Sequence, residues 1–178
     1  MKKLIAGLVL LATLGGCNDL LNTPTKRVEE FFNSYQTLDD SLLNNLDYSI
    51  ESNNLSEEEK NIYREIMKKQ YKDLTYKIKD ENIDGDTATV KVEIEVYDYN
   101  IASIKTNEYF NKNQKAFFNE ENEIDESKFI DYKLKIMKDI TERVKYTLEL
   151  IVRKKDKIWI MDNISHDDIL KIHGVYSY

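Results

Sequence analysis

Apolar side chains recur every three or four residues in three segments after residue 23, and this spacing predicts three amphipathic helices. The first covers Thr25 to Thr37, directly after Pro24, and Asp39 or Asp40 can cap the second. The third opens at Ser56-Glu57-Glu58-Glu59, where the Ser56 hydroxyl and the Glu59 carboxylate can form a capping box. The predicted inward faces comprise Val28, Phe31, Phe32 and Tyr35, then Leu42, Leu43, Leu46 and Ile50, then Ile62, Tyr63, Ile66, Met67, Gln70 and Tyr71.

The hydrophobic pattern then changes to a period of two, which is typical of strands with one buried face. Two alternating segments flank the turn signal Asp84-Gly85-Asp86, so we expect a long hairpin. Its second strand continues to Tyr99, and this unusual length indicates a strongly bent strand. The predicted inward positions are Leu74, Tyr76 and Ile78 on one strand and Val90, Val92, Ile94 and Val96 on the other.

The second half of the chain repeats the order of helices followed by a hairpin. We expect a weakly amphipathic helix over Asn100 to Asn119, then a polar loop up to Asp125, which can cap a further helix. A second hairpin follows, with Arg153 to Lys157 as its turn and Ile158 to Met161 as its returning strand. Its first strand has Val144, Tyr146, Leu148, Leu150 and Val152 inward, and Ile151 is the one apolar residue among the outward positions.

A last short helix is predicted between Ser165, its cap, and Gly174 in the usual C′ position. Helices packed on one face of an antiparallel sheet make an α+β domain. The order of elements resembles the cystatin-like cone of the nuclear-transport-factor-like superfamily. This resemblance implies N-terminal helices packed on a curved four-stranded antiparallel sheet made of two hairpins, with a helical insertion between them. The insertion is longer than the usual connection in that superfamily, so a smaller or differently wound sheet stays open.

Residues 1–17 have a pattern of their own. Two lysines, Lys2 and Lys3, precede an apolar run that is too short to span a bilayer, which takes about 20 residues. The motif Leu14-Gly15-Gly16-Cys17 resembles the bacterial lipobox. That resemblance implies transfer of a diacylglyceryl group to the Cys17 thiol and cleavage between Gly16 and Cys17. The alternatives are an ordinary cleaved signal with an unmodified cysteine, or an uncleaved membrane anchor.

Lipidation of Cys17 would hold the chain at the outer face of the cell membrane. Each buried methylene contributes about 0.8 kcal/mol, so two acyl chains, palmitate for example, form a stable lipid anchor. We therefore divide the chain into a signal peptide (1–16), a lipidated cysteine with a short tether (17–23) and a single α+β domain (24–178). From Cys17 to Thr25 the extended tether reaches about 25–30 Å, so the domain works close to its membrane.

Composition narrows the chemistry of the folded part. Because Cys17 is the only cysteine, its lipidation would leave no thiol for a disulfide, a nucleophile or a metal site. The formal net charge is −7, and it becomes −9 when residues 1–16 are removed with their two lysines. This acidic balance, without a basic stripe, disfavours nucleic acid as a partner. It also predicts that an anionic membrane or wall repels the domain.

Four stretches, residues 23–31, 67–76, 92–99 and 171–176, resemble a family of uncharacterised lipoproteins from low-GC Gram-positive bacteria. The bias of the chain towards Lys, Asn, Ile and Tyr fits such a source. The family has no established activity, so the resemblance implies none.

The histidines are the residues that titrate closest to neutral pH. His166-Asp167-Asp168 can be interpreted as part of a metal site or as a base with its orienting carboxylate. A metal site needs three or four converging ligands, however, and His173 lies two helical turns away. The favoured interpretation is that the two aspartates begin a helix and His173 ends it, where each charge suits the helix dipole. We predict no metal and no cofactor.

Tyr97-Asp98-Tyr99 is similar in type to the Tyr/Asp pairs that enzymes of the cone fold place in their pocket. We therefore keep Tyr97, Asp98, Tyr99 and His166 as weak pocket candidates, although structural aromatic residues at the rim of the sheet are the favoured interpretation. Ser-x-x-Lys, Gly-x-Ser-x-Gly and His-Glu-x-x-His motifs do not occur in the sequence. The sequence thus predicts a non-enzymatic binding or assembly module with a protein partner at the cell surface. The alternative is a cone-fold enzyme or small-molecule-binding protein with a pocket between helices and sheet.

Overall fold

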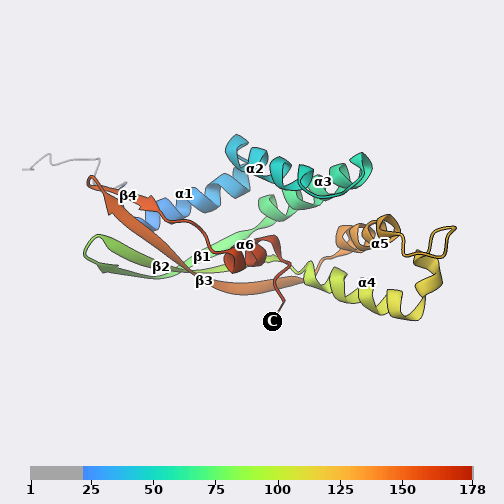
Figure 1. Cartoon of the computed structure of the whole chain (residues 1–178). Helices are drawn as coiled ribbons and strands as arrows, with labels where there is room; N and C mark the ends of the chain where they lie inside the picture. Colours follow the sequence, from blue (N-terminus) through green and yellow to red (C-terminus); the bar gives the residue numbers. More distant parts are fainter. Residues whose placement is uncertain (1–21, 178) are drawn as a thin grey trace, which may run out of the picture.

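The computed structural model describes residues 22–177, so Gly16, Cys17 and the predicted signal lie outside the described residues. Within this part the chain is an α+β fold, as predicted, with the helical insertion between the two hairpins (Figure 1). None of the helices within residues 22–177 is long and apolar enough to cross a bilayer. In chain order the elements are α1 (Pro24–Thr37), α2 (Asp40–Glu51), α3 (Glu57–Asp73), β1 (Thr75–Asp84), β2 (Thr87–Tyr97), α4 (Asn100–Lys112), the 3₁₀ helix η2 (Gln114–Phe117), α5 (Glu126–Asp139), β3 (Arg143–Lys155), β4 (Ile158–Met161) and α6 (His166–His173).

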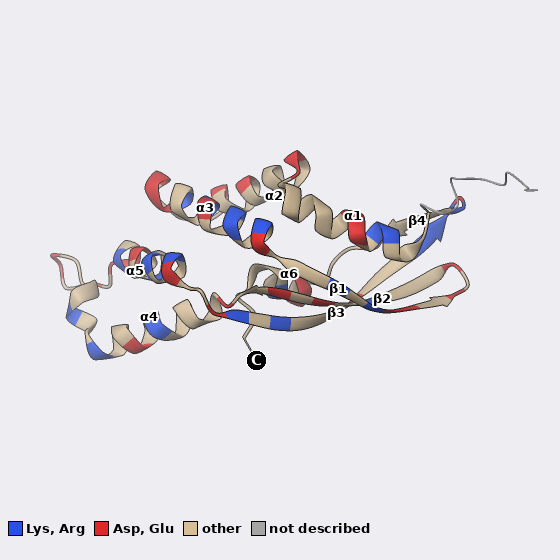
Figure 2. Cartoon of the chain, turned by 180° about the vertical axis from the view of Figure 1, so that it is seen from behind, with Lys and Arg blue, Asp and Glu red and all other residues tan. Residues whose placement is uncertain are grey.

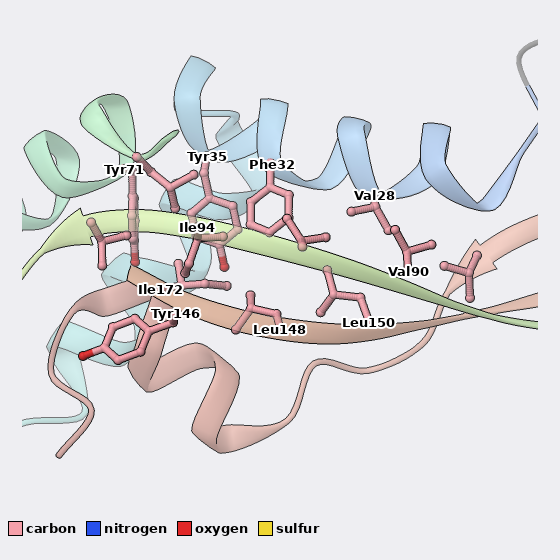
Figure 3. Packing of buried hydrophobic residues seen from close by; sticks show 14 of the residues in the cluster. Val28, Phe32, Tyr35, Tyr71, Val90, Ile94, Tyr146, Leu148, Leu150 and Ile172 are labelled. Carbon is pink, nitrogen blue, oxygen red and sulfur yellow. The ribbon is translucent and has the colours of Figure 1, made fainter. Parts of the chain in front are cut away.

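The four strands form one open antiparallel sheet in the order β1-β2-β3-β4, and β2 and β3 run long and curved through its middle (Figure 1). The strict alternation of apolar and polar residues gives the sheet one buried face, because successive side chains point to opposite sides. Figure 3 shows this face packed against α1 and α3, with Ile172 of α6 joining the same core. The fully buried positions include Val28, Phe32, Ile50, Met67, Val90, Val92, Ile94, Val96, Leu148, Val152 and Ile172.

The predicted helix starts are confirmed by their hydrogen bonds. Asp39 Oδ1 accepts from the Ser41 amide at 2.9 Å at the start of α2. At the start of α3, Ser56 Oγ accepts from the Glu59 amide at 3.2 Å, and Glu59 Oε2 accepts from the Ser56 amide at 2.6 Å. Both halves of the capping box are therefore formed. The side chains of Asp125 and Ser165 cap α5 and α6, and Gly174 ends α6 with a φ of 71°.

Strand β2 ends at Tyr97, two residues before the predicted end at Tyr99. The side chain of Gln70, in α3, occupies both backbone groups of Tyr97: it accepts from the amide at 2.9 Å and donates to the carbonyl at 3.0 Å. The Asn100 amide then donates to the carbonyl of Gly174 at 2.9 Å, where α4 begins. Sequence periodicity could not show this end, because the partners come from α3 and from the segment after α6.

Helix α4 ends at Lys112, whereas the sequence predicted one helix up to Asn119. Asn113 leaves the helical conformation (φ −137°, ψ 39°), and its side-chain amide donates to the Tyr109 carbonyl at 3.0 Å. The short helix η2 follows and buries Phe117, which is 2% exposed. We call residues 100–139, which comprise α4, η2 and α5, the helical arm, because they extend together from one end of the sheet (Figure 1).

The turn of the second hairpin is shorter than predicted. It consists of Asp156 and Lys157, with φ values of 52° and 67°, so Arg153 and Lys155 belong to β3 instead. Two left-handed residues in a row are the geometry that matches the twist of a hairpin. The cluster of lysines looks like a loop in the sequence, yet its backbone pairs with β4 up to Lys155 opposite Ile158.

Candidate functional site

The two tyrosines singled out by the sequence serve the structure at the end of β2. The Tyr97 hydroxyl donates to Asp73 Oδ2 at 2.8 Å, and the Lys69 ammonium lies 3.6 Å from the ring centroid of Tyr97. The hydrogen bond from Tyr97, together with Lys69, lowers the pKa of Asp73. Tyr99 is 2% exposed, and burial raises the pKa of its hydroxyl far above the neutral range. A general base needs a pKa near the working pH, so Tyr99 is unsuited to that role.

Asp98 and His166 do not join the tyrosines in a common pocket. Asp98 Oδ1 is buried and has no hydrogen-bond partner among the described residues, while its backbone amide donates to the Glu142 carbonyl at 2.9 Å. His166 is exposed at the first turn of α6. The four candidates line none of the hollows described below, and the space between helices and sheet is filled by the core.

The second histidine, His173, is half-buried beside the core. His173 Nε2 lies 2.9 Å from the Tyr71 hydroxyl, and burial lowers the pKa of His173 to about 4. At the start of α6, Ser165 Oγ accepts from the Asp168 amide at 3.1 Å, and Asp168 pairs with Lys171 at 3.0 Å. Within residues 22–177, no three His, Cys, Asp or Glu side chains gather in a way that could hold a metal ion.

A different site lies between α3 and α5, which the sequence did not indicate. A hollow of about 380 Å³ opens there, bounded by the loop between α2 and α3 and by the segment after α6. Its floor is apolar, with Leu134 and Met137 only 5% and 2% exposed. We call this hollow the α3–α5 groove; it is lined by Asn53, Leu55, Tyr63, Ile130, Lys133, Leu134, Met137 and Val175.

Lys133 is the one charged residue of this lining. Burial lowers the pKa of its ammonium group, and the part of the chain that the structure describes provides Lys133 with neither an ion pair nor a hydrogen bond. A half-buried ammonium without a partner loses part of its hydration and gains nothing in return. A carboxylate in the groove would satisfy it, so the groove suits a ligand with a negative charge beside apolar groups.

The groove continues past Leu55 and Ile130 into a second hollow of about 310 Å³ with the opposite character. Glu59 and Glu126 line this second hollow. Nearby, burial and the charge of Glu59 raise the pKa of Asp131. One end of the combined groove is therefore cationic and the other acidic. This polarity favours an extended segment with separated charges over a fatty acid, which has a single charged end.

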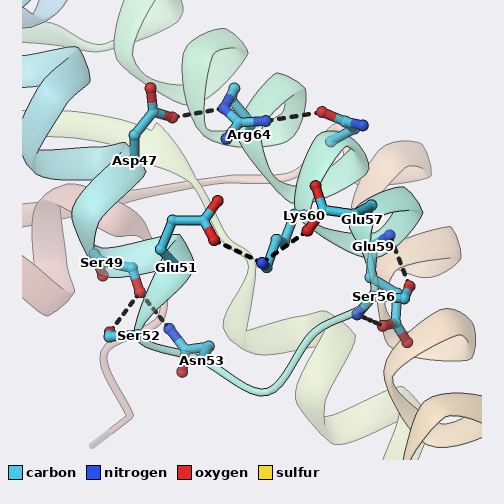
Figure 4. Close-up of polar contacts among 11 residues, drawn as sticks. Asp47, Ser49, Glu51, Ser52, Asn53, Ser56, Glu57, Glu59, Lys60 and Arg64 are labelled. Atoms are coloured by element: carbon cyan, nitrogen blue, oxygen red, sulfur yellow. Dashed lines mark hydrogen bonds and ion pairs between the residues drawn. The ribbon is translucent and has the colours of Figure 1, made fainter.

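Polar contacts hold the walls of the groove in place (Figure 4). Lys60 Nζ, in α3, lies 2.6 Å from Glu51 Oε2 and 2.9 Å from Glu57 Oε1, and so ties α2 to α3 across their loop. Between the groove walls themselves, Ser127 Oγ of α5 donates to Glu59 Oε1 at 2.8 Å. Burial alone would raise the pKa of Glu59, but the hydrogen bonds from Ser56 and Ser127 lower it, so the carboxylate stays charged.

The chain matches no family model, no curated protein and no solved structure. Its function must therefore be argued from its own geometry. The sequence holds no signal for the α3–α5 groove, because Tyr63 and Lys133 come from helices that only the fold brings together. A lysine beside Leu134 on an amphipathic helix looks like an ordinary solvent-facing residue.

Proposed function

We propose that the chain is a lipoprotein, anchored outside the cell membrane through Cys17, that binds a peptide segment of a protein partner in the α3–α5 groove. The observation that carries the binding function is the half-buried ammonium of Lys133, which has no ion pair or hydrogen bond within residues 22–177 and lies above the apolar floor of the groove. The lipobox-like motif supports the anchor. The proposal assigns no chemical reaction to the chain.

An extended peptide fits the groove on three grounds. Leu55, Ile130 and Val175 offer apolar contact, and each apolar side chain that a peptide buries there contributes about 1.5–3 kcal/mol. Lys133 would accept an acidic side chain, and the acidic end near Glu126 would accept a basic one. The ties between α2, α3 and α5 keep the groove in its bound shape before the partner arrives, which lowers the entropic cost of binding.

The binding function is tested with a random peptide library selected against the full chain. We expect the enriched peptides to carry a carboxylate next to a bulky apolar residue. The substitution Lys133→Met keeps the stem of the side chain and removes its charge, so it should weaken these peptides about tenfold or more. Lys135→Met changes an exposed lysine of the same helix and should alter their affinity less than about twofold. Peptides that bind both variants equally well would refute the groove as the site.

The anchor is tested separately in the producing cell. We expect wild-type protein to fractionate with membranes and Cys17→Ser to be released or to retain its precursor size. Globomycin, which blocks the lipoprotein signal peptidase, should also leave the longer precursor. Mass spectrometry that finds an unmodified thiol at Cys17, or an N-terminus elsewhere, would contradict the lipoprotein assignment.

A further inference from the structure

The first described residue is fixed to the edge of the sheet. Strand β4 is an edge strand, and its outer backbone groups need a partner or solvent. Asn22 supplies that partner: its Oδ1 accepts from the Trp159 amide at 3.0 Å, and its Nδ2 donates to the Lys157 carbonyl at 2.7 Å. The chain therefore reaches the domain at the β3–β4 hairpin. Only four residues lie between Cys17 and Asn22, so this part of the chain reaches at most about 17–18 Å.

The tip of this hairpin is the most basic stretch of the sequence. Four cations, Arg153, Lys154, Lys155 and Lys157, fall within five residues and surround a single Asp156. Arg153 pairs with Asp162 at 2.8 Å, and the Lys154 ammonium lies 5.5 Å from the ring centroid of Trp159. The charged groups of Lys155 and Lys157 contact no other described residue through an ion pair or hydrogen bond, and both residues are exposed.

Apolar side chains accompany the cations on one face of the hairpin. Antiparallel partners point to the same side of a sheet. Lys155 stands opposite Ile158, and Arg153 stands opposite Ile160, so these four side chains share a face. Ile158 and Ile160 are 52% and 48% exposed, whereas Trp159 between them is 6% exposed on the other side. We call these four side chains, together with the turn residue Lys157, the hairpin face.

We infer that the hairpin face docks on anionic lipid headgroups of the membrane that holds the anchor. The inference rests on the proposed lipid anchor at Cys17. Lysines beside exposed isoleucines match a membrane interface, where phosphates attract the cations and the acyl boundary accepts apolar side chains. The short reach from Cys17 to Asn22 holds this face within contact distance of the headgroups. The β3–β4 end of the domain then faces the membrane, and the helical arm with the α3–α5 groove extends away from it.

This docking is compatible with the acidic character of the whole chain. The repulsion predicted from a net charge of −7 treats the charge as evenly spread. Figure 2 shows instead a basic β3–β4 tip and an acidic β1–β2 turn as separate tips at the same end of the molecule. At physiological salt, charges act over about 8 Å, so the local cations decide which tip approaches the surface. The acidic turn with Asp84 and Asp86 is repelled, which fixes the tilt of the domain.

Trp159 is the only tryptophan of the chain but is buried on the opposite side of the hairpin, so the contact is reported by Ile160→Trp in a chain that also carries Trp159→Phe. The full lipoprotein is inserted into vesicles with brominated acyl chains, made of phosphatidylcholine alone or with about 30 mol % phosphatidylglycerol. We expect lipid bromines to quench the tryptophan at position 160 in the anionic vesicles and at least about twofold less in the neutral ones. High salt should reverse the quenching.

The double substitution Lys155→Glu with Lys157→Glu should abolish the difference in quenching between the two vesicle types. Lys112→Glu with Lys115→Glu, which changes the net charge equally on the helical arm, should leave it intact.

The outcomes separate this inference from the anchor. Equal quenching of a protein that stays bound to both vesicle types overturns the hairpin docking and leaves the lipid anchor standing. A protein that does not stay with neutral vesicles contradicts the anchor, and quenching on anionic vesicles then still decides the docking. Binding of soluble polyglycerol phosphate that depends on Lys155 and Lys157, without quenching by vesicles, overturns the inference in favour of a wall polymer.

Discussion

The sheet with its covering helices and the helical arm are built on different principles. The sheet buries a core drawn from both ends of the chain, in which Val28, Val90 and Ile172 have no exposed surface. The arm packs mainly against itself and against one turn of α3, through a small cluster around Leu134 and Met137. The sheet region therefore depends on contacts distant in sequence, whereas the arm depends mainly on contacts within residues 100–139, with α3 as its main distant partner. The arm should open locally without unfolding the sheet.

The far end of the arm is held by aromatic rings. Phe117 of η2 lies at the centre, with ring centroids of Tyr109, Phe110, Phe129 and Tyr132 5.3–5.9 Å away. Tyr109 and Tyr132 stack at 4.5 Å and join α4 to α5. Edge-on and stacked ring pairs contribute about 0.5–1.5 kcal/mol each beyond their burial. Phe117 thus holds the arm together as Phe32 of α1 holds the sheet core.

Truncating these two phenylalanines should produce the largest effects and should break the molecule in different places. Phe32→Ala removes a fully buried ring and should lower the global free energy of unfolding by about 3–5 kcal/mol. Phe117→Ala should lower the free energy of local unfolding of the arm by a similar amount but leave the sheet folded. Hydrogen exchange checks this: the amides of α4 and α5 should lose protection in Phe117→Ala, while β2 and β3 keep theirs.

The conservative variants Phe32→Leu and Phe117→Leu serve as controls, because the same amides should lose protection but to a smaller extent. Uniform loss of protection in Phe117→Ala would mean that arm and sheet unfold as one unit, and the comparison would fail.

The two regions meet where β2 becomes α4, and a glycine makes that meeting possible. A Cβ on Gly174 would lie 2.0 Å from the Tyr97 carbonyl oxygen and 2.5 Å from Gln70 Nε2, and the φ of 71° is strained for any other residue. We expect Gly174→Ala to lower the free energy of unfolding by about 3 kcal/mol and to loosen the arm along with α6. Chemical denaturation with exchange at the start of α4 measures both.

Gly85→Ala is the matched control for backbone strain alone. Gly85 also has a positive φ, 58°, but nothing lies within 4 Å of a Cβ built there. We expect Gly85→Ala to lower the free energy of unfolding by about 1 kcal/mol and to change hydrogen exchange only in the β1–β2 turn. If the two substitutions lowered the free energy of unfolding equally, the close approach of Gly174 to the Tyr97 carbonyl would contribute nothing to stability.

The same contrast explains how much of the fold the sequence could predict. The alternation in β2, from Val90 to Val96, and the capping box at Ser56 are local patterns, and both are confirmed. The errors fall where the deciding contacts are not encoded in the periodicity of apolar residues. Gln70 ends β2 at Tyr97, and Asn113 with the ring cluster ends α4 before Asn119. The basic tip looked like a loop because lysines carry no strand signal, although its backbone pairs with β4.

The candidate sites were harder to predict than the elements. Tyr97, Asp98 and Tyr99 are adjacent in sequence, and the rings of Tyr97 and Tyr99 stack with their centroids 6.0 Å apart, but none of the three residues lines the hollows described above. The sequence around Lys133 does not mark it as a binding residue, since only the approach of α3 to α5 partly buries its side chain. Asn22 looked like part of a tether, and its role depends on the free edge of β4. The anchor at Cys17 stays a prediction.

The last expected effect concerns acid, and it should act on the sheet region. His173 packs against Tyr71 of α3 at 2.9 Å, and burial lowers the pKa of His173 from 6.5 to about 4. The unfolded chain therefore binds a proton more readily than the folded chain between these values. Stability from this residue is complete above about pH 6.5 and is lost as the pH falls towards 4.

The full shift in the pKa of His173 corresponds to about 3 kcal/mol. Because the ring keeps some contact with solvent, we expect about half of that, measured as the pH-dependent difference in unfolding free energy between wild type and His173→Gln, which keeps a partner for Tyr71. His166→Gln, at an exposed position, should give no such difference. Identical pH profiles for wild type and His173→Gln would show that the buried ring does not couple acid to the sheet.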